Sequence, residues 1–333
     1  MYVNQLLKIM SGIIMNHHVN WYDLNRNYSN QKITQPGRVF PDRIVRCLFM
    51  VTFSPAQVCV KIGMAGKTKC NLPAFNMLVR AFLAGAYIAM GAALATVGST
   101  GVSAVFGAGI SQFVTGALFP IGLIIIVLTG AELFTGDAMF APMAVLQGHV
   151  GIGRLVYLWV VVYIGNLIGS LFMAFLVSYG PYTSWSAAGV ATVTAFGLRA
   201  IAIGTAKVSY TGAMGILSCF FKAILCNWLV CLSLFLALAA EDVIGKMAAI
   251  WFPIMAFVAS GYEHCVANMY FIPAAIITNG FTGNTVAGLD WVGMWTNNII
   301  WATLGNIVGA GLFMAIVYYY CYKSDICALC ETK

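Results

Sequence analysis

The sequence predicts an all-α membrane protein with six transmembrane helices, arranged as two inverted three-helix repeats with broken second and fifth helices. Three observations lead to this fold class: an apolar composition, six long apolar segments and an internal repeat. Of the 333 residues, 61% are hydrophobic and only 8% are charged, whereas a soluble domain carries about 25% charged residues. Lipid must therefore replace water over much of the surface. This composition excludes disorder, a nucleic-acid-binding domain and a typical cytosolic enzyme.

Residues 1–49 form a polar, basic extension before the first apolar segment. Nine of the 17 Lys and Arg residues precede Leu72, and only Asp23 and Asp42 oppose them. Such an arm indicates the cytoplasmic side under the positive-inside rule, so we infer no nucleic-acid partner from it. Two interpretations stay open: Met50 is the biological start, or the extension is a flexible cytoplasmic tail. We expect a six-helix domain at 50–323 and a cytoplasmic tail at 324–333.

The six apolar segments run over 74–97, 110–148, 153–179, 210–240, 248–279 and 292–322. A helix needs about 20 residues to cross the hydrocarbon core. Four segments fit one crossing each, and the longer second and fifth are interrupted by acidic residues and by glycine or proline. An even number of spans puts both termini on one side, which the basic arm makes cytoplasmic. The 180–209 connection would then lie outside, although it contains Arg199 and Lys207.

The pattern G-x-E-x4-[D/N]-x2-F-x-P begins at Gly130 and again at Gly261, 131 residues later. A second echo, Gly-Asn-x2-Gly-x-Leu-Phe-Met-Ala or a close variant of it, begins at Gly165 and at Gly305. Two echoes in the same order indicate that spans one to three repeat as spans four to six. Because three is an odd number, the two halves must be inverted. Inverted repeats with broken helices are typical of transporters and channels with a site near the midplane.

The two breaks hold most of the polar residues predicted inside the membrane. A charged side chain at the bilayer centre costs at least about 2.5–3.5 kcal/mol, and irregular backbone there must be buried or line a cavity. For Glu132 and Glu263 we favour a structural role, accepting hydrogen bonds from helix-end amides, over a direct role in transport. Asp137 and Asn268 are candidate caps of the half-helices that follow.

His264 is the only histidine within a predicted span, since His17 and His18 lie in the extension and His149 in a loop. A lone buried histidine is usually a core residue. Because this one lies inside a helix break and can titrate near neutral pH, we favour a functional role.

The runs 130–137 (GAELFTGD) and 260–269 (SGYEHCVANM) resemble the two signature segments of the formate/nitrite transporter family, and 225–232 (LCNWLVCL) resembles its fourth span. The resemblance covers about 50–323 and is strongest to prokaryotic formate carriers, including those of methane-forming organisms. It implies an aquaporin-like six-helix protomer in a homopentamer, with one pore per protomer. It also implies transport of small monovalent anions: formate, nitrite, hydrosulfide and, weakly, acetate or lactate.

The resemblance also implies roles for residues at matching positions. His264 matches the central pore histidine, and the other pore positions, counting Asn268 of the second break, are Leu133, Phe134, Thr135, Phe119, Leu123, Phe257, Asn227 and Val230. Of these, Phe119, Leu123 and Phe257 match hydrophobic constrictions. Lys69 and Lys207 match vestibule lysines on the cytoplasmic and outer sides. We expect a multi-pass protein of the plasma or inner membrane with both termini cytoplasmic.

A formate anion cannot cross a dry constriction easily, because moving a carboxylate-sized ion into low dielectric costs on the order of 20 kcal/mol. Protonating it at pH 7 costs only about 5 kcal/mol, since such an acid titrates near ~3.5. Proton coupling is therefore expected, with His264 either donating the proton or polarising a water that does. A proton symporter and a channel both remain open.

Two other function classes fit the sequence less well. An aquaporin-type channel for neutral solutes would place Asn-Pro-Ala at both breaks, where this chain has Asp137-Ala138-Met139 and Asn268-Met269-Tyr270. An intramembrane enzyme would need paired Asp or a Ser/His set within the spans. The Cys327/Cys330 pair lacks the four ligands of a structural zinc site. We therefore predict no enzymatic activity, cofactor or metal.

Overall fold

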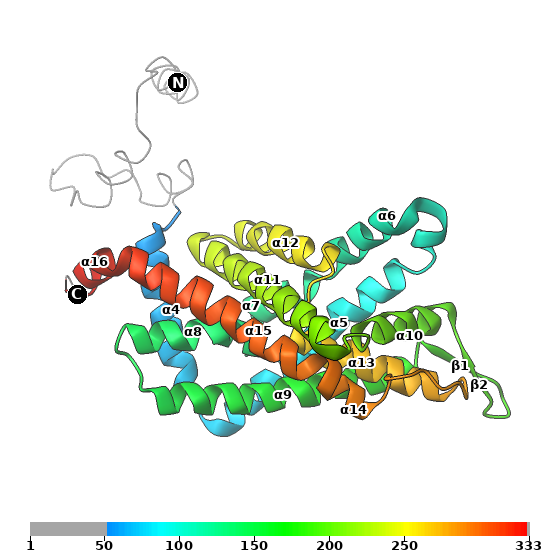
Figure 1. The fold of residues 1–333 in the computed structure, drawn as a ribbon. Coiled ribbons are helices and arrows are strands. Elements are labelled where there is room, and N and C mark those ends of the chain that lie inside the picture. The colour runs from blue at the N-terminus through cyan, green and yellow to red at the C-terminus, as the bar shows by residue number, and fades with distance from the viewer. Residues whose placement is uncertain (1–51, 332–333) are drawn as a thin grey trace, which may run out of the picture. The chain divides into compact units, whose positions relative to one another are not determined.

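The computed structural model describes residues 52–331, so the predicted extension at 1–49 and Met50 lie outside the described residues. The described part is predominantly helical (Figure 1). Within it, the only strands, β1 (Thr183–Trp185) and β2 (Ala191–Val193), form one antiparallel hairpin in the 180–209 connection.

The elements before the hairpin are α4 (Pro55–Cys70), α5 (Ala74–Gly98), α6 (Val102–Leu118), α7 (Ile121–Thr129), α8 (Phe134–Leu146) and α9 (Ile152–Tyr179). Those after it are α10 (Ala195–Lys207), α11 (Gly212–Ala239), α12 (Val243–Ala259) and α13 (Cys265–Gly280). The last helix consists of α14 (Trp291–Met294), the π-helical turn η1 (Trp295–Ile299), α15 (Ile300–Ala310), a second π-helical turn η2 (Gly311–Ile316) and α16 (Val317–Glu331). Because α16 continues to Glu331, the tail predicted from residue 324 begins as helix.

Five helices of the described part are long and apolar enough to cross a membrane: 74–98, 102–129, 152–179, 212–239 and 291–330. They overlap five of the six predicted spans, and the second predicted segment, 110–148, also contains the separate helix α8. The remaining segment, 248–279, is divided between α12 and α13, of 17 and 16 residues. Each is shorter than the roughly 20 residues that one crossing needs. Because five other helices are each long and apolar enough to cross, the protein is a multi-pass membrane protein.

Both predicted breaks are present, and each begins at a glycine in the left-handed region. Gly130 follows α7 with φ of 74°, and Gly261 lies just beyond α12 with φ of 69°. A residue with a Cβ is disfavoured in this conformation. The chain then runs without helix to α8 and to α13.

Two buried asparagines hold the breaks in place, and both belong to the Gly-Asn echo of the sequence. Asn166 on α9 donates through Nδ2 to the carbonyl oxygens of Glu132, at 2.9 Å, and Ala81, at 2.8 Å. Its Oδ1 accepts from the Phe134 amide at 2.9 Å. These bonds satisfy backbone groups on both sides of the first break, where lipid offers no partner.

Asn306 on α15 repeats this arrangement at the second break. Its Nδ2 donates to the carbonyl oxygens of Glu263, at 2.9 Å, and Ala223, at 2.8 Å. Its Oδ1 accepts from the Cys265 amide at 2.9 Å. The two halves of the chain thus use the same side chain for the same three bonds.

Glycines of the same echo let helices approach closely. A Cβ on Gly169 of α9 would lie 2.0 Å from the carbonyl oxygen of Phe82 on α5, and one on Gly309 of α15 would lie 2.4 Å from that of Ile224 on α11. Both distances are too short for a carbon–oxygen contact, so these positions need glycine. The pairs α5–α9 and α11–α15 therefore pack backbone against backbone, as small residues permit in membrane helices.

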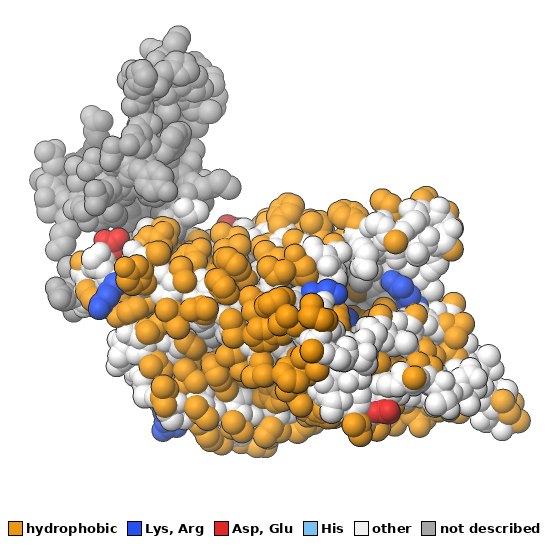
Figure 2. All heavy atoms as spheres, viewed as in Figure 1, with side chains coloured by type: hydrophobic (Ala, Val, Ile, Leu, Met, Phe, Trp, Pro, Cys, Tyr) orange, Lys and Arg blue, Asp and Glu red, His pale blue; other side chains and the backbone are white. Residues whose placement is uncertain are grey.

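α4 packs on α8 and α10 packs on α13. Figure 1 shows α4 and α16 at one end of the described unit, and α10 with the β-hairpin at the other. We call these the α4 end and the α10 end. Hydrophobic side chains cover most of the face visible in Figure 2, and large ones such as Phe172, Leu225 and Phe252 are exposed. Such a surface requires lipid or another protomer.

Gly169→Ala is expected to lower the thermal midpoint of the detergent-solubilised protein, because the added Cβ meets a backbone carbonyl that cannot rotate away. Overpacking of this kind costs about 1–3 kcal/mol. The matched control is Gly153→Ala in the same helix, where a Cβ meets nothing within 4 Å and helix propensity favours alanine by up to about 1 kcal/mol. Equal midpoints for the two variants, measured by tryptophan fluorescence, would contradict the close approach of α5 and α9.

Candidate functional site

A narrow cavity lies between the two breaks. It is lined by Ile88, Phe119, Leu123, Leu133, Val230, Ile254, Phe257 and His264. The space between these side chains is too narrow for a water molecule, and each described lining residue except His264 is apolar. The structure thus brings six predicted site residues to one dry cavity. Sequence analysis missed Ile88 and Ile254, because nothing distinguishes them from core residues in an apolar segment.

Three rings meet along one side of this cavity. The Phe119 and Phe257 rings pack edge to face with centroids 5.8 Å apart. The Phe257 ring lies nearly parallel to the His264 imidazole, also at 5.8 Å. Phe257 and His264 are not on one helix, because α12 ends at Ala259 and His264 immediately precedes α13. The contact between their rings therefore comes from the path of the break.

His264 is held by hydrogen bonds at both ring nitrogens. Its Nδ1 accepts from the Ala267 amide at 3.0 Å, which makes His264 the N-cap of α13. Its Nε2 lies 3.1 Å from the hydroxyl of Thr135, which follows the first break. Because Nδ1 accepts a hydrogen bond, the neutral imidazole has its proton on Nε2, which then donates to Thr135 Oγ1. This histidine therefore links the two breaks across the cavity.

The predicted caps are wrong at both half-helices. Asn268 donates to Glu263 and not to helix-end groups, and His264 caps α13 instead. At α8 the N-cap position is Leu133, which makes no side-chain hydrogen bond, and Asp137 lies within the first turn. A histidine cap is not expected from sequence, since Ser, Thr, Asp and Asn are the usual N-cap residues.

Four predicted pore residues do not line the cavity: Thr135, Asn268, Phe134 and Asn227. Thr135 contacts His264 and Asn268 contacts Glu263, as described above. The buried Phe134 ring packs edge to face against Tyr163 at 5.0 Å and Trp159 at 6.1 Å, both on α9. Asn227 on α11 donates through Nδ2 to the carbonyl oxygens of Thr135, at 3.0 Å, and Asn306, at 2.7 Å. The Phe134 ring therefore packs against α9, and Asn227 joins the start of α8 to α15.

Lysine and acid side chains form a buried cluster beside the first break. Lys69 on α4 donates to Glu132 Oε2 and lies 3.2 Å from Asp137 Oδ1. Arg80 Nη1 lies 4.0 Å from Glu132 Oε1. We call Lys69, Arg80, Glu132 and Asp137 the first-break cluster. The Glu132 carboxylate thus binds cationic side chains and not the helix-end amides expected from the sequence.

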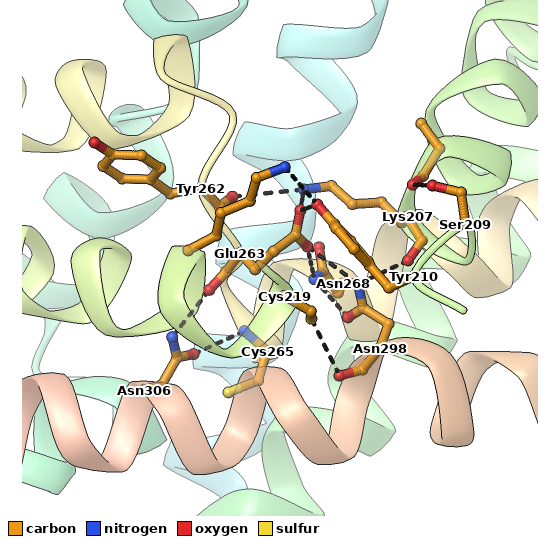
Figure 3. A network of polar contacts seen from close by, with 12 residues as sticks. Lys207, Ser209, Tyr210, Cys219, Tyr262, Glu263, Cys265, Asn268, Asn298 and Asn306 are labelled. Carbon is orange, nitrogen blue, oxygen red and sulfur yellow. Dashed lines mark hydrogen bonds and ion pairs between the residues drawn. The ribbon is translucent and has the colours of Figure 1, made fainter. Parts of the chain in front are cut away.

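The second break has a corresponding cluster around Glu263 (Figure 3). Glu263 Oε1 accepts from Lys207 Nζ and from the Tyr210 hydroxyl, each at 2.8 Å. Glu263 Oε2 accepts from Asn268 Nδ2 at 2.7 Å and from Asn298 Nδ2 at 3.1 Å. Asn268 Nδ2 also lies 2.7 Å from Asn298 Oδ1.

Lys222 on α11 completes this arrangement by donating from Nζ to the Tyr210 hydroxyl at 3.0 Å. We call Lys207, Tyr210, Lys222, Glu263, Asn268 and Asn298 the second-break cluster. Sequence analysis did not single out Tyr210, Lys222 or Asn298. Asn298 and Lys222 were detectable as polar residues inside predicted spans.

Lys69 and Lys207, the two predicted vestibule lysines, occupy equivalent positions in the two halves of the chain. Each is on a helix that precedes a span and each is paired with the glutamate of one break. Their side chains are only 19% and 17% exposed. The charge of each is therefore largely neutralised by a carboxylate, as a buried ion requires.

Residues 56–320 match the family model for formate/nitrite transporters. The chain is 42% identical to a probable formate transporter of Methanothermobacter thermautotrophicus, over 82% of this chain and 98% of that protein. It is 34% identical to the nitrite transporter NirC of Escherichia coli (strain K12), over 73% of this chain and 82% of that one.

Two solved structures are also similar. One, described as an FNT family ion channel, has a TM-score of 0.66 and 30% identity, covering 80% of this chain and 98% of its own. The other, a pentameric formate channel with formate bound, has a TM-score of 0.63 and 33% identity, covering 75% and 98%. With the match to residues 56–320, these likenesses show that the chain belongs to the formate/nitrite transporter family, whose members are channels and transporters.

Proposed function

We propose that this protein moves small monovalent anions across a membrane, formate before others, and that a proton crosses with the anion. The observation that best supports this proposal is the dry cavity whose described lining is apolar except for His264. Relatives include a probable formate transporter and nitrite transporters, so nitrite is the alternative substrate, followed by hydrosulfide. A channel for neutral solutes is a weaker alternative.

The apolar lining of this cavity favours proton coupling. A bare carboxylate would meet only Phe, Leu, Ile and Val side chains and one imidazole there. Leaving water for such surroundings costs on the order of 20 kcal/mol in the Born limit, against about 5 kcal/mol for protonation at neutral pH. Formate therefore crosses the constriction as formic acid.

His264 and Thr135 are proposed as the polar contact halfway through. His264 Nε2 and Thr135 Oγ1 are 3.1 Å apart, and in this proposal either group can donate instead to an oxygen of the passing solute. A proton lost from Nε2 would have to return to Nε2, because Nδ1 is bound by the Ala267 amide. This arrangement favours a histidine that polarises formate, or a water beside it, over one that shuttles protons between its two nitrogens.

We also propose the complete architecture: six spans in two inverted repeats, with α12 and α13 together forming the fifth, and a homopentamer in the plasma membrane with both termini cytoplasmic. The matching bonds of Asn166 and Asn306 support the repeat. The pentameric formate channel among the similar structures supports the assembly. In this arrangement Lys69 lies near the cytoplasmic mouth and Lys207 near the outer one.

Vesicles reconstituted with the protein should take up labelled formate and nitrite faster than protein-free vesicles. Formate uptake should rise as the external pH falls from 7 to 5, because the fraction of neutral acid increases about tenfold per pH unit. Stopped-flow water and ammonia permeability of the same vesicles provides the comparison. Faster water or ammonia permeation without formate or nitrite uptake would favour the neutral-solute alternative.

His264→Phe should abolish formate uptake, since it removes both the Nε2 donor and the cap of α13. His264→Asn should keep a cap, because asparagine is a good N-cap residue, but should slow uptake and change its pH dependence. Proton and formate uptake are measured together, with size-exclusion chromatography to verify assembly. Wild-type flux and pH dependence in both variants would remove His264 from the mechanism.

Phe257→Ala and Phe119→Ala should widen the constriction and admit lactate or nitrate, which the wild type should pass slowly. The control is Phe134→Ala, which removes an equally buried ring that packs on α9 and does not line the cavity. Phe134→Ala should be less stable, since such a truncation costs about 3–5 kcal/mol in comparable cores. It should keep the selectivity of the wild type. Unchanged selectivity in stable Phe257 or Phe119 variants would show that the ring is an ordinary core residue.

A further inference from the structure

Each of the four residues of the first-break cluster has a counterpart in the second-break cluster, but the two clusters differ in charge. The Glu132 amide donates to the Arg80 carbonyl oxygen at 3.3 Å, and the Glu263 amide to that of Lys222 at 3.5 Å, so Arg80 and Lys222 hold equivalent places. The equivalent pairs are Lys69 and Lys207, Arg80 and Lys222, Glu132 and Glu263, and Asp137 and Asn268. One pair differs in charge: a carboxylate, Asp137, corresponds to an amide, Asn268.

This difference leaves one cation unbalanced at the second break. In the first-break cluster two cations face two carboxylates, and each cation lies within 4.0 Å of a carboxylate oxygen. In the second-break cluster two cations face one carboxylate. Glu263 is already bound by Lys207, Tyr210, Asn268 and Asn298.

Lys222 is the unbalanced cation. Among residues 52–331, no carboxylate lies within ion-pair distance of its Nζ. Its Nζ donates to the Tyr210 hydroxyl and lies 5.0 Å from the centroid of that ring. Because an ammonium has three donors, N–H groups remain for an anion. The side chain is half-buried, so such an anion would be partly desolvated and held more strongly than at an open surface.

We propose that Lys222, oriented by Tyr210, is an anion-binding residue of the α10 end, and that the α4 end has no counterpart because Arg80 is paired with Glu132. The proposal rests on the proposed transport of small anions and adds a specific residue and a sidedness to it. Formate or nitrite arriving from the α10 side meets a free ammonium group before the dry cavity. An anion arriving from the α4 side meets a cluster whose charges balance.

The test is Lys222→Gln in vesicles of one orientation, with formate uptake measured from each side at low salt. The half-saturating formate concentration for entry from the α10 side should rise about three- to tenfold, as expected for a partly exposed charged hydrogen bond. The maximal rate should stay within about twofold, and the difference should shrink at high salt. Entry from the α4 side should keep its half-saturating concentration.

Two variants serve as controls. Lys222→Arg keeps the charge and should stay near wild type, and Lys323→Gln removes an exposed lysine on α16 and should change nothing. Asn268→Asp gives the second-break cluster the charge balance of the first-break cluster. It should therefore raise the half-saturating formate concentration for entry from the α10 side, as Lys222→Gln does. An unchanged concentration in Lys222→Gln, or an equal rise from both sides, would overturn the proposal.

A binding measurement separates this proposal from the proposed function. The NMR line of 13C-formate should broaden when the detergent-solubilised wild type is added. With Lys222→Gln the line should be narrower than with the wild type, whether or not vesicles show flux. Absence of formate and nitrite uptake by the wild type would reject the transport proposal alone. Equal linewidths for wild type and Lys222→Gln would reject Lys222 as an anion-binding residue, even if transport is normal.

Discussion

The structure depends on one constraint: lipid supplies no hydrogen-bond partners, so backbone released at a helix break must find them inside the protein. Asn166 and Asn306 meet this constraint. Each binds a carbonyl oxygen before the break, an amide after it and a carbonyl oxygen of a neighbouring helix. The two asparagines thus fix the breaks relative to α5 and α11, and the glycines beside them on α9 and α15 bring those helices into contact.

The same constraint applies to charge. Glu132 and Glu263 are 3% and 1% exposed, and each is stabilised by a lysine from a helix that precedes a span. Isolated carboxylates at this depth would be costly, whereas paired and hydrogen-bonded ones are tolerated. The lysines that α4 and α10 supply are therefore part of the structure of the breaks. Within the two break clusters, the pairing is incomplete only at Lys222, which is why we propose that residue as the one that binds an anion.

His264 has two roles that fix its chemistry. As the N-cap of α13 it uses the Nδ1 lone pair, and this determines that the Nε2 proton faces Thr135 and the cavity. The stacked Phe257 ring and the surrounding aliphatic side chains exclude water from this position. A group that stabilises the fold thereby presents a single hydrogen-bond donor to the cavity, which we propose as the transport path.

The sequence by itself determined the membrane class, the family resemblance and the two breaks, and it singled out His264 as a candidate pore residue, because composition, repeats and rare polar residues in apolar segments are visible along the chain. Tertiary structure alone decided which apolar side chains line the cavity. Phe134 and Leu133 are neighbours in sequence, yet one packs on α9 and the other faces the cavity. It also decided that His264 caps α13 and that lysines pair with the break glutamates. The two lysine–glutamate pairs join residues 63 and 56 positions apart, and the His264–Thr135 contact joins residues 129 positions apart. No local pattern records which distant helix will supply the partner.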